Sequence, residues 1–338
     1  MSTVVPTGPR RPAGPHTPRG IPVLRTAVRR TLSRLFGPPP FDPAGEPGDP
    51  GLTGPGSASW QVIGEPAAIA GGLRGLLLQV AHPLAMAGVH DHSAFRDDPL
   101  GRLQRTSAYV TTTTFGSTRE ALHVSRIVRR VHPRVRGTAP DGRPYTAEDP
   151  HLLAWVSIAL TSSFLATDRR WSPVPVTGSR ADAFVAEQSR IAALLDPRVD
   201  LTPFERDPDA RAALRAGEVD LPMLRDGTLP TSVTDLDAAL TRYAPELGIN
   251  DQGAQALRFL RRPPIPVAAR GGYRALFGGA VASLEPHEAR ALRLQLSRTT
   301  RAARSARAGA VLATMRLVTG TSPSRRLAEE RAARGCSQ

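Results

Sequence analysis

The sequence predicts a mostly all-α fold, a single large helical domain preceded by a tail rich in proline, glycine and arginine. Alanine, leucine and arginine are abundant, and these residues favour helix over strand. No sustained alternation of polar and apolar residues indicates a large sheet. A chain of 338 residues can bury one sizeable core. We therefore divide the chain into a disordered basic tail at 1–58, a helical domain at 59–320 and a basic C-terminal tail at 321–338.

The net charge of +14 is concentrated at the two ends of the chain. Residues 1–40 carry seven arginines and no acid, and residues 290–338 carry eleven arginines against two glutamates. Every basic residue is arginine, which we attribute to genome base composition. Because no aromatic platform or binding motif accompanies the charge, it predicts no specific nucleic-acid partner. It is compatible with peripheral contact between the Arg-rich tails and an acidic membrane.

The first 58 residues lack the pattern of a core. Residues 1–22 and 37–58 are rich in proline and glycine, so we expect them to be disordered or extended. The basic amphipathic segment between them, 22–36, suits a membrane surface or a helix docked on the body equally well. No apolar stretch follows Arg10 and Arg11, so we expect no signal peptide. The single cysteine, Cys336, excludes an internal disulfide and favours a cytoplasmic location.

A long apolar helix should begin at Pro66 and run to about Val89, with a kink near Pro83. Polar residues along it, Arg74, Gln79 and His82, favour a buried core helix over a membrane span. His82 is a candidate ligand, although a histidine hydrogen-bonded beside a kink explains it equally well. His90 and His92 follow, but two histidines at this spacing face the same side only in extended structure, so we do not assign them a metal.

Two helices from Leu100 to His132 carry the most informative polar residues. The first places Arg102, Arg105, Thr106 and Tyr109 on a single face at spacings of three and four. The second begins at the capping box of Ser117 and Glu120 and carries a row of valines (Val124, Val128 and Val131). It should stop at His132, because Pro133 disfavours helical geometry in the residue before it, with Gly137 suited to a left-handed turn. A cofactor fits between the two helices.

The remaining elements follow from local signals. Asp141-Gly142 favours a hairpin within 138–145, and Asp149-Pro150 starts a helix whose Thr161, Ser162 and Ser163 are expected to face the pocket. Further helices are expected at about 180–195, 233–243, 252–260, 273–284 and 286–318. The second of these is capped by Thr231 or Ser232.

From Gly71 to Leu165 the chain resembles the catalytic domain of the MpaB-type oxygenases and rubber oxygenases (latex-clearing proteins). Three blocks in order carry the likeness: LRGLLLQVAHPLAMAGVHDHSAFRDDPLGRLQRT, then VHPRVRG, then DGRPYTAEDPHLLAWVSIALTSSFL. A weaker likeness continues through Phe184 to Gln188 and into the segment from Arg262 to Pro266.

The resemblance implies an all-helical domain that binds haem b, with His132 as the proximal iron ligand. Arg102, Arg105 and Thr106 match the family's polar residues on the oxygen side and are the candidate catalytic residues. Arg102, Arg136 and His82 are the other candidate cofactor-binding residues. The rubber oxygenases place a lysine at the position of Arg105, and a guanidinium has no lone pair to give to iron.

The resemblance thus predicts a haem b-dependent oxygenase that uses O2 on a lipophilic, unsaturated, terpenoid- or lipid-like substrate. The alternative is a non-catalytic haem- or lipid-binding helical protein that associates with membranes through its Arg-rich tails. A membrane- or nucleic-acid-associated helical scaffold that uses its Arg-rich tails is a further alternative.

Overall fold

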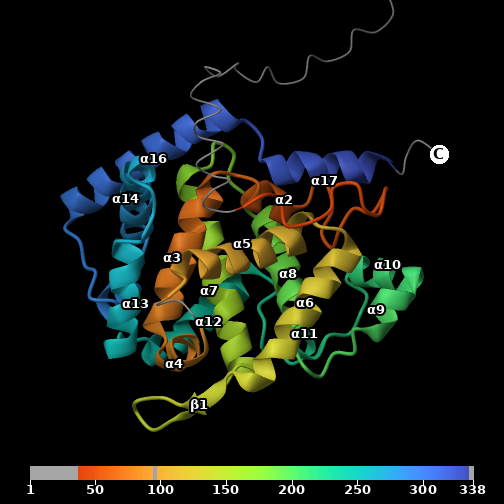
Figure 1. The fold of residues 1–338 in the computed structure, drawn as a ribbon, viewed down its shortest axis with the longest axis horizontal. Helices are drawn as coiled ribbons and strands as arrows, with labels where there is room; N and C mark the ends of the chain where they lie inside the picture. Colours follow the sequence, from red (N-terminus) through yellow and green to blue (C-terminus); the bar gives the residue numbers. More distant parts are fainter. Residues whose placement is uncertain (1–36, 94–96, 335–338) are drawn as a thin grey trace, which may run out of the picture.

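The computed structural model describes residues 37–93 and 97–334. Within these ranges, sixteen α-helices and one two-stranded sheet make up the regular structure, which confirms the predicted mostly all-α class (Figure 1). The first helices are α2 (Ala58–Ile63), α3 (Ala67–Ala81), α4 (Pro83–His92), α5 (Pro99–Phe115) and α6 (Thr118–Val131). After the hairpin come α7 (Pro150–Trp171), α8 (Ser179–Ala193), α9 (Thr202–Arg206), α10 (Pro208–Ala216), α11 (Pro222–Arg225) and α12 (Val233–Tyr243). The last are α13 (Asp251–Arg261), α14 (Val267–Ala282), α15 (Pro286–Ala291), α16 (Arg298–Thr319) and α17 (Pro323–Ala333).

Helices α3 and α7 lie side by side at the centre of the molecule (Figure 1). Two glycines on α3 allow this close approach. A Cβ added at Gly71 would lie 2.7 Å from Phe164, and one added at Gly75 would lie 2.7 Å from Leu160. Because α7 is long and apolar, it is the one helix in the described part of the chain that could span a membrane by length and composition. In this fold, 67% of its apolar window is buried, as in the core helix of a soluble protein.

The long apolar helix expected from Pro66 to Val89 is two helices rather than one kinked helix. The chain leaves helical geometry at His82, whose φ and ψ are −96° and 112°. Pro83 forces this break because it disfavours helical geometry in the residue before it. His82 then becomes the N-cap of α4, and its Nδ1 accepts the backbone amide of Ala85.

A buried ion pair fixes the central helices to a distant part of the chain. One guanidinium nitrogen of Arg74 on α3 lies 2.6 Å from a carboxylate oxygen of Glu288 on α15, and both side chains are almost fully buried. The same guanidinium donates to Ser163 Oγ on α7. Ser163 therefore serves a structural contact between helices, whereas we had expected it to face a pocket.

The hairpin predicted near Asp141-Gly142 is present. Strands β1 (Arg136–Thr138) and β2 (Pro144–Thr146) pair antiparallel, with Gly137 opposite Tyr145. Gly142 has a φ of 86°, the left-handed conformation that this turn needs. Gly137 belongs to β1, so our expectation of a left-handed turn at this residue was wrong. It is instead packed against the ring of Tyr145, since an added Cβ would lie 2.7 Å from the tyrosine oxygen.

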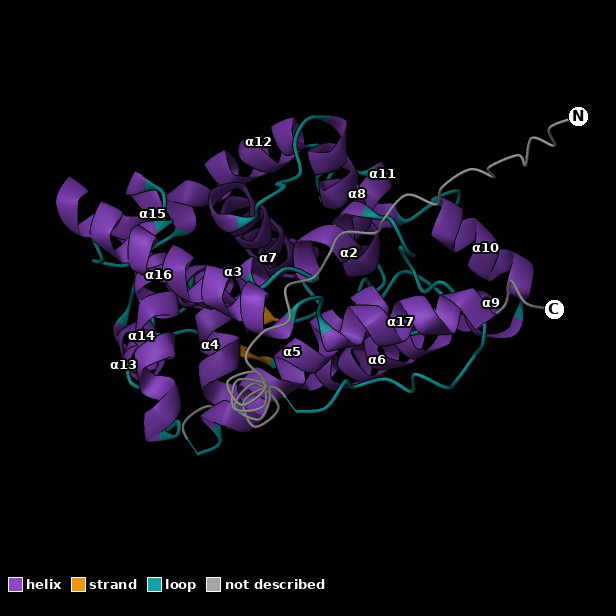
Figure 2. Ribbon diagram, turned by 90° about the horizontal axis from the view of Figure 1, so that it is seen from above, coloured by secondary structure: helices purple, strands orange, loops and turns teal. Residues whose placement is uncertain are grey.

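The two ends of the described chain pack together against α2 and α5, whereas we expected tails at both ends. Phe41, Trp60, Phe115 and Ala328 form one buried cluster. Arg331 of α17 is fully buried and donates to the backbone oxygens of Asp49 and Gly116. Helix α17 packs against α5 (Figure 2). The predicted amphipathic segment at 22–36 lies outside the described residues.

The C-terminal third differs from prediction in its boundaries. The helix expected at 273–284 begins at Val267, because Pro266 occupies the N-cap and does not interrupt a helix there. The helix expected at 286–318 is interrupted between α15 and α16, where Arg293 adopts a positive φ of 54°. The three short helices α9 to α11 lacked a periodic pattern long enough to predict them.

Candidate functional site

Helices α5 and α6 form the frame of the candidate site and pack side by side (Figure 2). Asp98 caps α5 by accepting the backbone amide of Gly101 at 2.8 Å. Ser117 and Glu120 cap α6 through the reciprocal pair of hydrogen bonds that the sequence predicted. Because both caps lie at defined positions, the side chains that follow them have a fixed rotation about each helix axis.

His132 follows Val131, the last residue of α6, close to the predicted end of the helix. Our physical reason for that end was wrong, because His132 keeps helical φ and ψ of −54° and −39° and a 3-10 turn (His132–Arg134) continues through Pro133. Its Nδ1 is buried and has no hydrogen-bond partner, and no described residue bonds to its other ring nitrogen. Burial lowers the pKa of His132 below its ordinary value, so the ring is neutral at pH 7. A neutral imidazole without hydrogen-bond partners has a lone pair available for a metal.

An incompletely covered apolar row runs along α6 toward His132. Val124 and Val128 are half-buried, while the side chains of Ile127 and Val131 are 44% and 50% exposed. These four residues share one face at helical spacing. A row of incompletely covered aliphatic side chains is a candidate surface for an apolar ligand.

Arg102 of α5 is a half-buried cation whose partners are neutral. Its guanidinium donates to Ser93 Oγ at 2.7 Å and to Gln79 Oε1 at 3.2 Å. No ion pair with a carboxylate of the described residues balances its charge. Burial and the neighbouring Arg105 lower the pKa of Arg102 to about 10, and the group remains protonated at pH 7. Its positive charge is therefore available to an anionic ligand.

The other residues of the predicted stripe have different environments. The side chain of Arg105 is 64% exposed and pairs with Asp98 at 3.3 Å, so it faces solvent more than Arg102 does. Thr106 Oγ1 donates to the backbone oxygen of Arg102, one turn earlier on α5. Tyr109, on the same face, has its hydroxyl buried, and burial raises its pKa to about 12.

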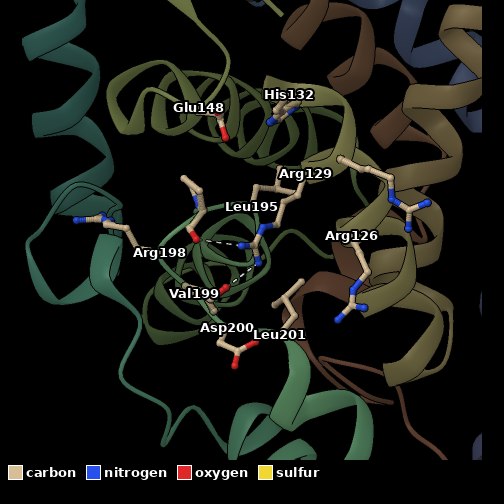
Figure 3. A pocket seen from close by; sticks show the side chains of 11 residues that line it. Arg126, Arg129, His132, Glu148, Leu195, Arg198, Val199, Asp200 and Leu201 are labelled. Carbon is tan, nitrogen blue, oxygen red and sulfur yellow. Dashed lines mark hydrogen bonds between the residues drawn. The ribbon is translucent and has the colours of Figure 1, made fainter. Parts of the chain in front are cut away.

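An open cavity of about 570 Å³ borders His132 (Figure 3). Its lining is mixed polar and apolar and comes from α6, the chain before α7 and the loop after α8. Its charged members are Arg126, Arg129, Arg130, Glu148, Arg198 and Asp200. Arg129 donates to the backbone oxygens of Pro197 and Val199, which holds that loop against α6. Arg102, Arg105 and Thr106 do not line this cavity.

His82, the alternative ligand, is fully buried and has partners at both ring nitrogens. Nδ1 accepts the amide of Ala85, and Nε2 lies 3.2 Å from Glu246 Oε2. Burial lowers the pKa of His82, while Glu246 opposes this shift. The structure thus places His82 in a hydrogen-bonded position at a helix break, apart from the α5–α6 pair.

Arg136 and the segment His90-Asp91-His92 meet at the hairpin. The side chain of Arg136 is exposed on β1, and its backbone oxygen faces His92 Nε2 at 3.1 Å. Asp91 lies 2.8 Å from His90 Nδ1 and accepts the hydroxyl of Tyr145 at 2.6 Å. These contacts join α4 to the hairpin.

The comparison with known proteins identifies one family. Residues 60–318 match the family described as ER-bound oxygenase mpaB/B'/Rubber oxygenase, catalytic domain. The chain belongs to this family. No curated protein and no solved structure matches it. Membership in an oxygenase family makes the chain an oxidoreductase by class, and it confirms the resemblance seen in the sequence.

The residues that sequence reasoning missed come from outside the blocks that carry the family likeness, or are unremarkable within them. Gln79 and Ser93 orient Arg102 from α3 and from the end of α4. Glu246 lies 164 residues after His82, so no local pattern joins them. In this fold, helix packing rather than sequence spacing brings these hydrogen-bond partners to Arg102 and His82.

Proposed function

We propose that this oxygenase-family chain is a haem b-dependent oxygenase that uses O2 on a lipophilic, unsaturated, terpenoid- or lipid-like substrate. The observation that carries the proposal is His132, a neutral imidazole without hydrogen-bond partners at the end of a partly uncovered apolar helix face. Haem iron accepts such a nitrogen as its proximal ligand.

The residues present fit haem in two further respects. The apolar row on α6 (Val124, Ile127, Val128 and Val131) offers the aliphatic contacts that a porphyrin face needs. Arg102 offers a cation without a carboxylate partner, which suits a haem propionate. Bound haem supplies the chemistry of oxygen activation.

The protein's own residues would bind and orient the haem and would exclude water from it. His132 would present a ring nitrogen to the iron from the 3-10 turn (His132–Arg134) that follows α6. Arg102 is held in place by Gln79 and Ser93, so its charge has a fixed position. Arg105 keeps a permanent charge at the position of the rubber oxygenases' lysine, and its guanidinium would have no lone pair to give to iron.

We place the enzyme in the cytoplasm, in peripheral contact with membranes. The basis is charge: arginines outnumber acids eleven to two in residues 290–338. An acidic lipid surface would bring a basic protein to the compartment in which lipophilic substrates concentrate.

The test uses the full chain purified from cells supplied with a haem precursor. We expect about one haem per chain, a Soret band and ready binding of cyanide or imidazole, because Arg105 would not compete with these ligands for iron. Oxygen uptake should then rise on addition of terpenoid or polyunsaturated acyl substrates. A chain that retains haem without substrate-dependent oxygen uptake would be a haem-binding protein instead. A chain that retains no haem would contradict the proposal.

A further inference from the structure

Two histidines and one glutamate converge at the break between α3 and α4. His82, His151 and Glu246 each present a ligand atom, and these three atoms lie within 4.8 Å of one another. Neither Arg102 nor His132 belongs to this cluster. The proposed haem site therefore does not account for it.

Three separate elements hold the cluster in place. His82 lies at the helix break, His151 in the first turn of α7, and Glu246 at the end of a short 3-10 turn (Ala244–Glu246) that follows α12. Asp149 caps α7 by accepting the amide of His151 at 2.9 Å. Tyr243 donates its hydroxyl to the backbone oxygen of His151 at 2.8 Å. The positions of the cluster residues are thus fixed by caps and by contacts between helices.

Aromatic packing fixes the two imidazole rings as well. The ring of Tyr243 lies 4.5 Å from that of His151, and the ring of Trp155 lies 5.4 Å from that of His82. Rings held in this way lose little conformational entropy on binding an ion, so the cluster is preorganised.

We propose that His82, His151 and Glu246 form a binding site for one divalent transition-metal ion, with zinc as the best fit. Two imidazoles and a carboxylate are a common three-residue ligand set for zinc. Nε2 of His151 lies 2.9 and 3.0 Å from the two carboxylate oxygens, and Nε2 of His82 lies 3.2 Å from one of them. Ligand atoms about 2.0–2.2 Å from a tetrahedral zinc are about 3.3–3.6 Å apart, so each histidine–glutamate contact needs to lengthen only slightly. The two histidine nitrogens lie within 4.8 Å of each other.

The cluster is buried on one side and open to solvent on the other. His82 is fully buried, whereas the side chains of His151 and Glu246 are 50% and 29% exposed. A metal ion can enter from solvent, and a water molecule can complete four-coordination on that side. The pattern matches zinc sites with three protein ligands and an open position.

One contact changes on binding. A metal at Nε2 leaves the ring proton of His82 on Nδ1, which can then no longer accept the amide of Ala85. That cap is 3.4 Å long, at the outer limit of a hydrogen bond, so it is a weak bond to lose. His151 loses no hydrogen bond when its Nε2 binds a metal, because no hydrogen bond from a described residue occupies its Nδ1.

The experiment titrates the untagged, chelator-treated full chain with Zn²⁺ and with Co²⁺. Elemental analysis after dialysis should give one zinc per chain, and Co²⁺ should produce the visible absorption of a low-symmetry four- or five-coordinate ion. Zinc should also raise the melting temperature, since it binds the folded chain. His151→Ala and Glu246→Gln should each weaken binding more than the roughly 10–100-fold that outer-shell changes cost.

The matched control is His123→Ala, an exposed histidine of α6, which should bind metal like the wild type. His151 and Glu246 are partly exposed, so their variants should fold, and circular dichroism checks this. Less than stoichiometric binding by the wild type would overturn the metal site. Unchanged binding in either variant would also overturn it, leaving a hydrogen-bonded cluster only. Measurement with and without haem keeps this outcome separate from that of the proposed oxygenase.

Discussion

Arg102 and Arg105 lie one turn apart on α5 but differ in environment. Arg102 is half-buried with neutral partners, and Arg105 is largely exposed and paired with Asp98. Helical spacing placed both on one face, but spacing does not say how far neighbouring helices cover that face. The structure therefore separates two residues that the sequence treats as equivalent.

The pair offers a direct comparison of the two cations. Arg102→Gln should lower haem affinity about 10–100-fold, because a charged hydrogen bond contributes about 1.5–3 kcal/mol. Arg105→Gln should change haem affinity much less, because its charge is solvated and already paired. Haem titration of both apoproteins, followed at the Soret band, measures the difference. Equal losses in the two variants would show that Arg105 also contacts the cofactor.

Asp168 of α7 gives a pH-dependent prediction. It is almost fully buried and accepts the amide of Val176 at 2.8 Å, and burial raises its pKa above the ordinary value of 3.8. The folded state binds its proton more tightly than the unfolded state, so Asp168 contributes stability at low pH that is lost as the pH rises through the raised pKa.

Asp168→Asn should therefore stabilise the protein at pH 7, by about 1.4 kcal/mol for each unit by which the pKa is raised. The gain should shrink as the pH falls through the raised pKa and vanish below 3.8. Urea denaturation at several pH values measures it, with the exposed Asp237→Asn as control. A loss of stability at pH 7 would show that the charge itself is required.

At the scale of elements, the contact between α3 and α7 depends on where glycines lie. An added Cβ at Gly71 would come within 2.7 Å of Phe164 and Thr167, whereas one at Gly72 meets nothing within 4 Å. Both glycines are in the same turn of α3, so an alanine at either position has the same effect on helix propensity. The two positions differ only in how closely α7 approaches them.

Gly71→Ala should destabilise the protein by about 1–3 kcal/mol through overpacking. Gly72→Ala should stabilise it by up to about 1 kcal/mol, because alanine favours helix and the site is open. Thermal or urea unfolding of the two variants gives the comparison. If both substitutions changed stability in the same direction, the close approach of α7 would be disproved.

Local signals predicted the helix starts that depend on neighbouring residues. Ser117, Asp149 and Ser232 cap α6, α7 and α12 as the sequence indicated, since a cap and its helix are adjacent in the chain. Pairings between distant residues could not be read in this way. Glu288 lies 214 residues after Arg74, so only the packed fold brings them together. The sequence could not distinguish His82 from His132 as a metal ligand for the same reason. Whether each ring nitrogen has a free lone pair depends on residues distant in the chain.

At the scale of the whole molecule, the described ends of the chain complete the core. Phe41 and Leu52 are buried, and Arg331 bonds to the backbone of Asp49 and Gly116. Proline and glycine content suggested a disordered segment at 37–58. Of the ten glycines with positive φ among the described residues, however, five lie between residues 37 and 56. These glycines form turns that pack, and composition alone does not distinguish such turns from disorder.

Removal of residues 1–57 should therefore lower the melting temperature by several degrees and expose Trp60 and Phe115. The physical reason is the loss of the apolar contacts made by Phe41 and Leu52, at about 25 cal/mol for each Å² of apolar surface. Differential scanning calorimetry measures the shift, and dye binding reports the exposed cluster. An unchanged melting temperature would mean that this segment is dispensable for the fold, as its composition first suggested.

The central claim is that His132 holds the cofactor of a haem oxygenase, and the visible spectrum of His132→Ala tests it most directly. The variant is compared with His123→Ala, which changes an exposed histidine of α6 itself, and with His82→Ala. We predict that His132→Ala loses the Soret band or most of its haem, while His123→Ala keeps both. A wild-type spectrum in His132→Ala together with a lost Soret band in His82→Ala would contradict the account and assign the iron to the break between α3 and α4.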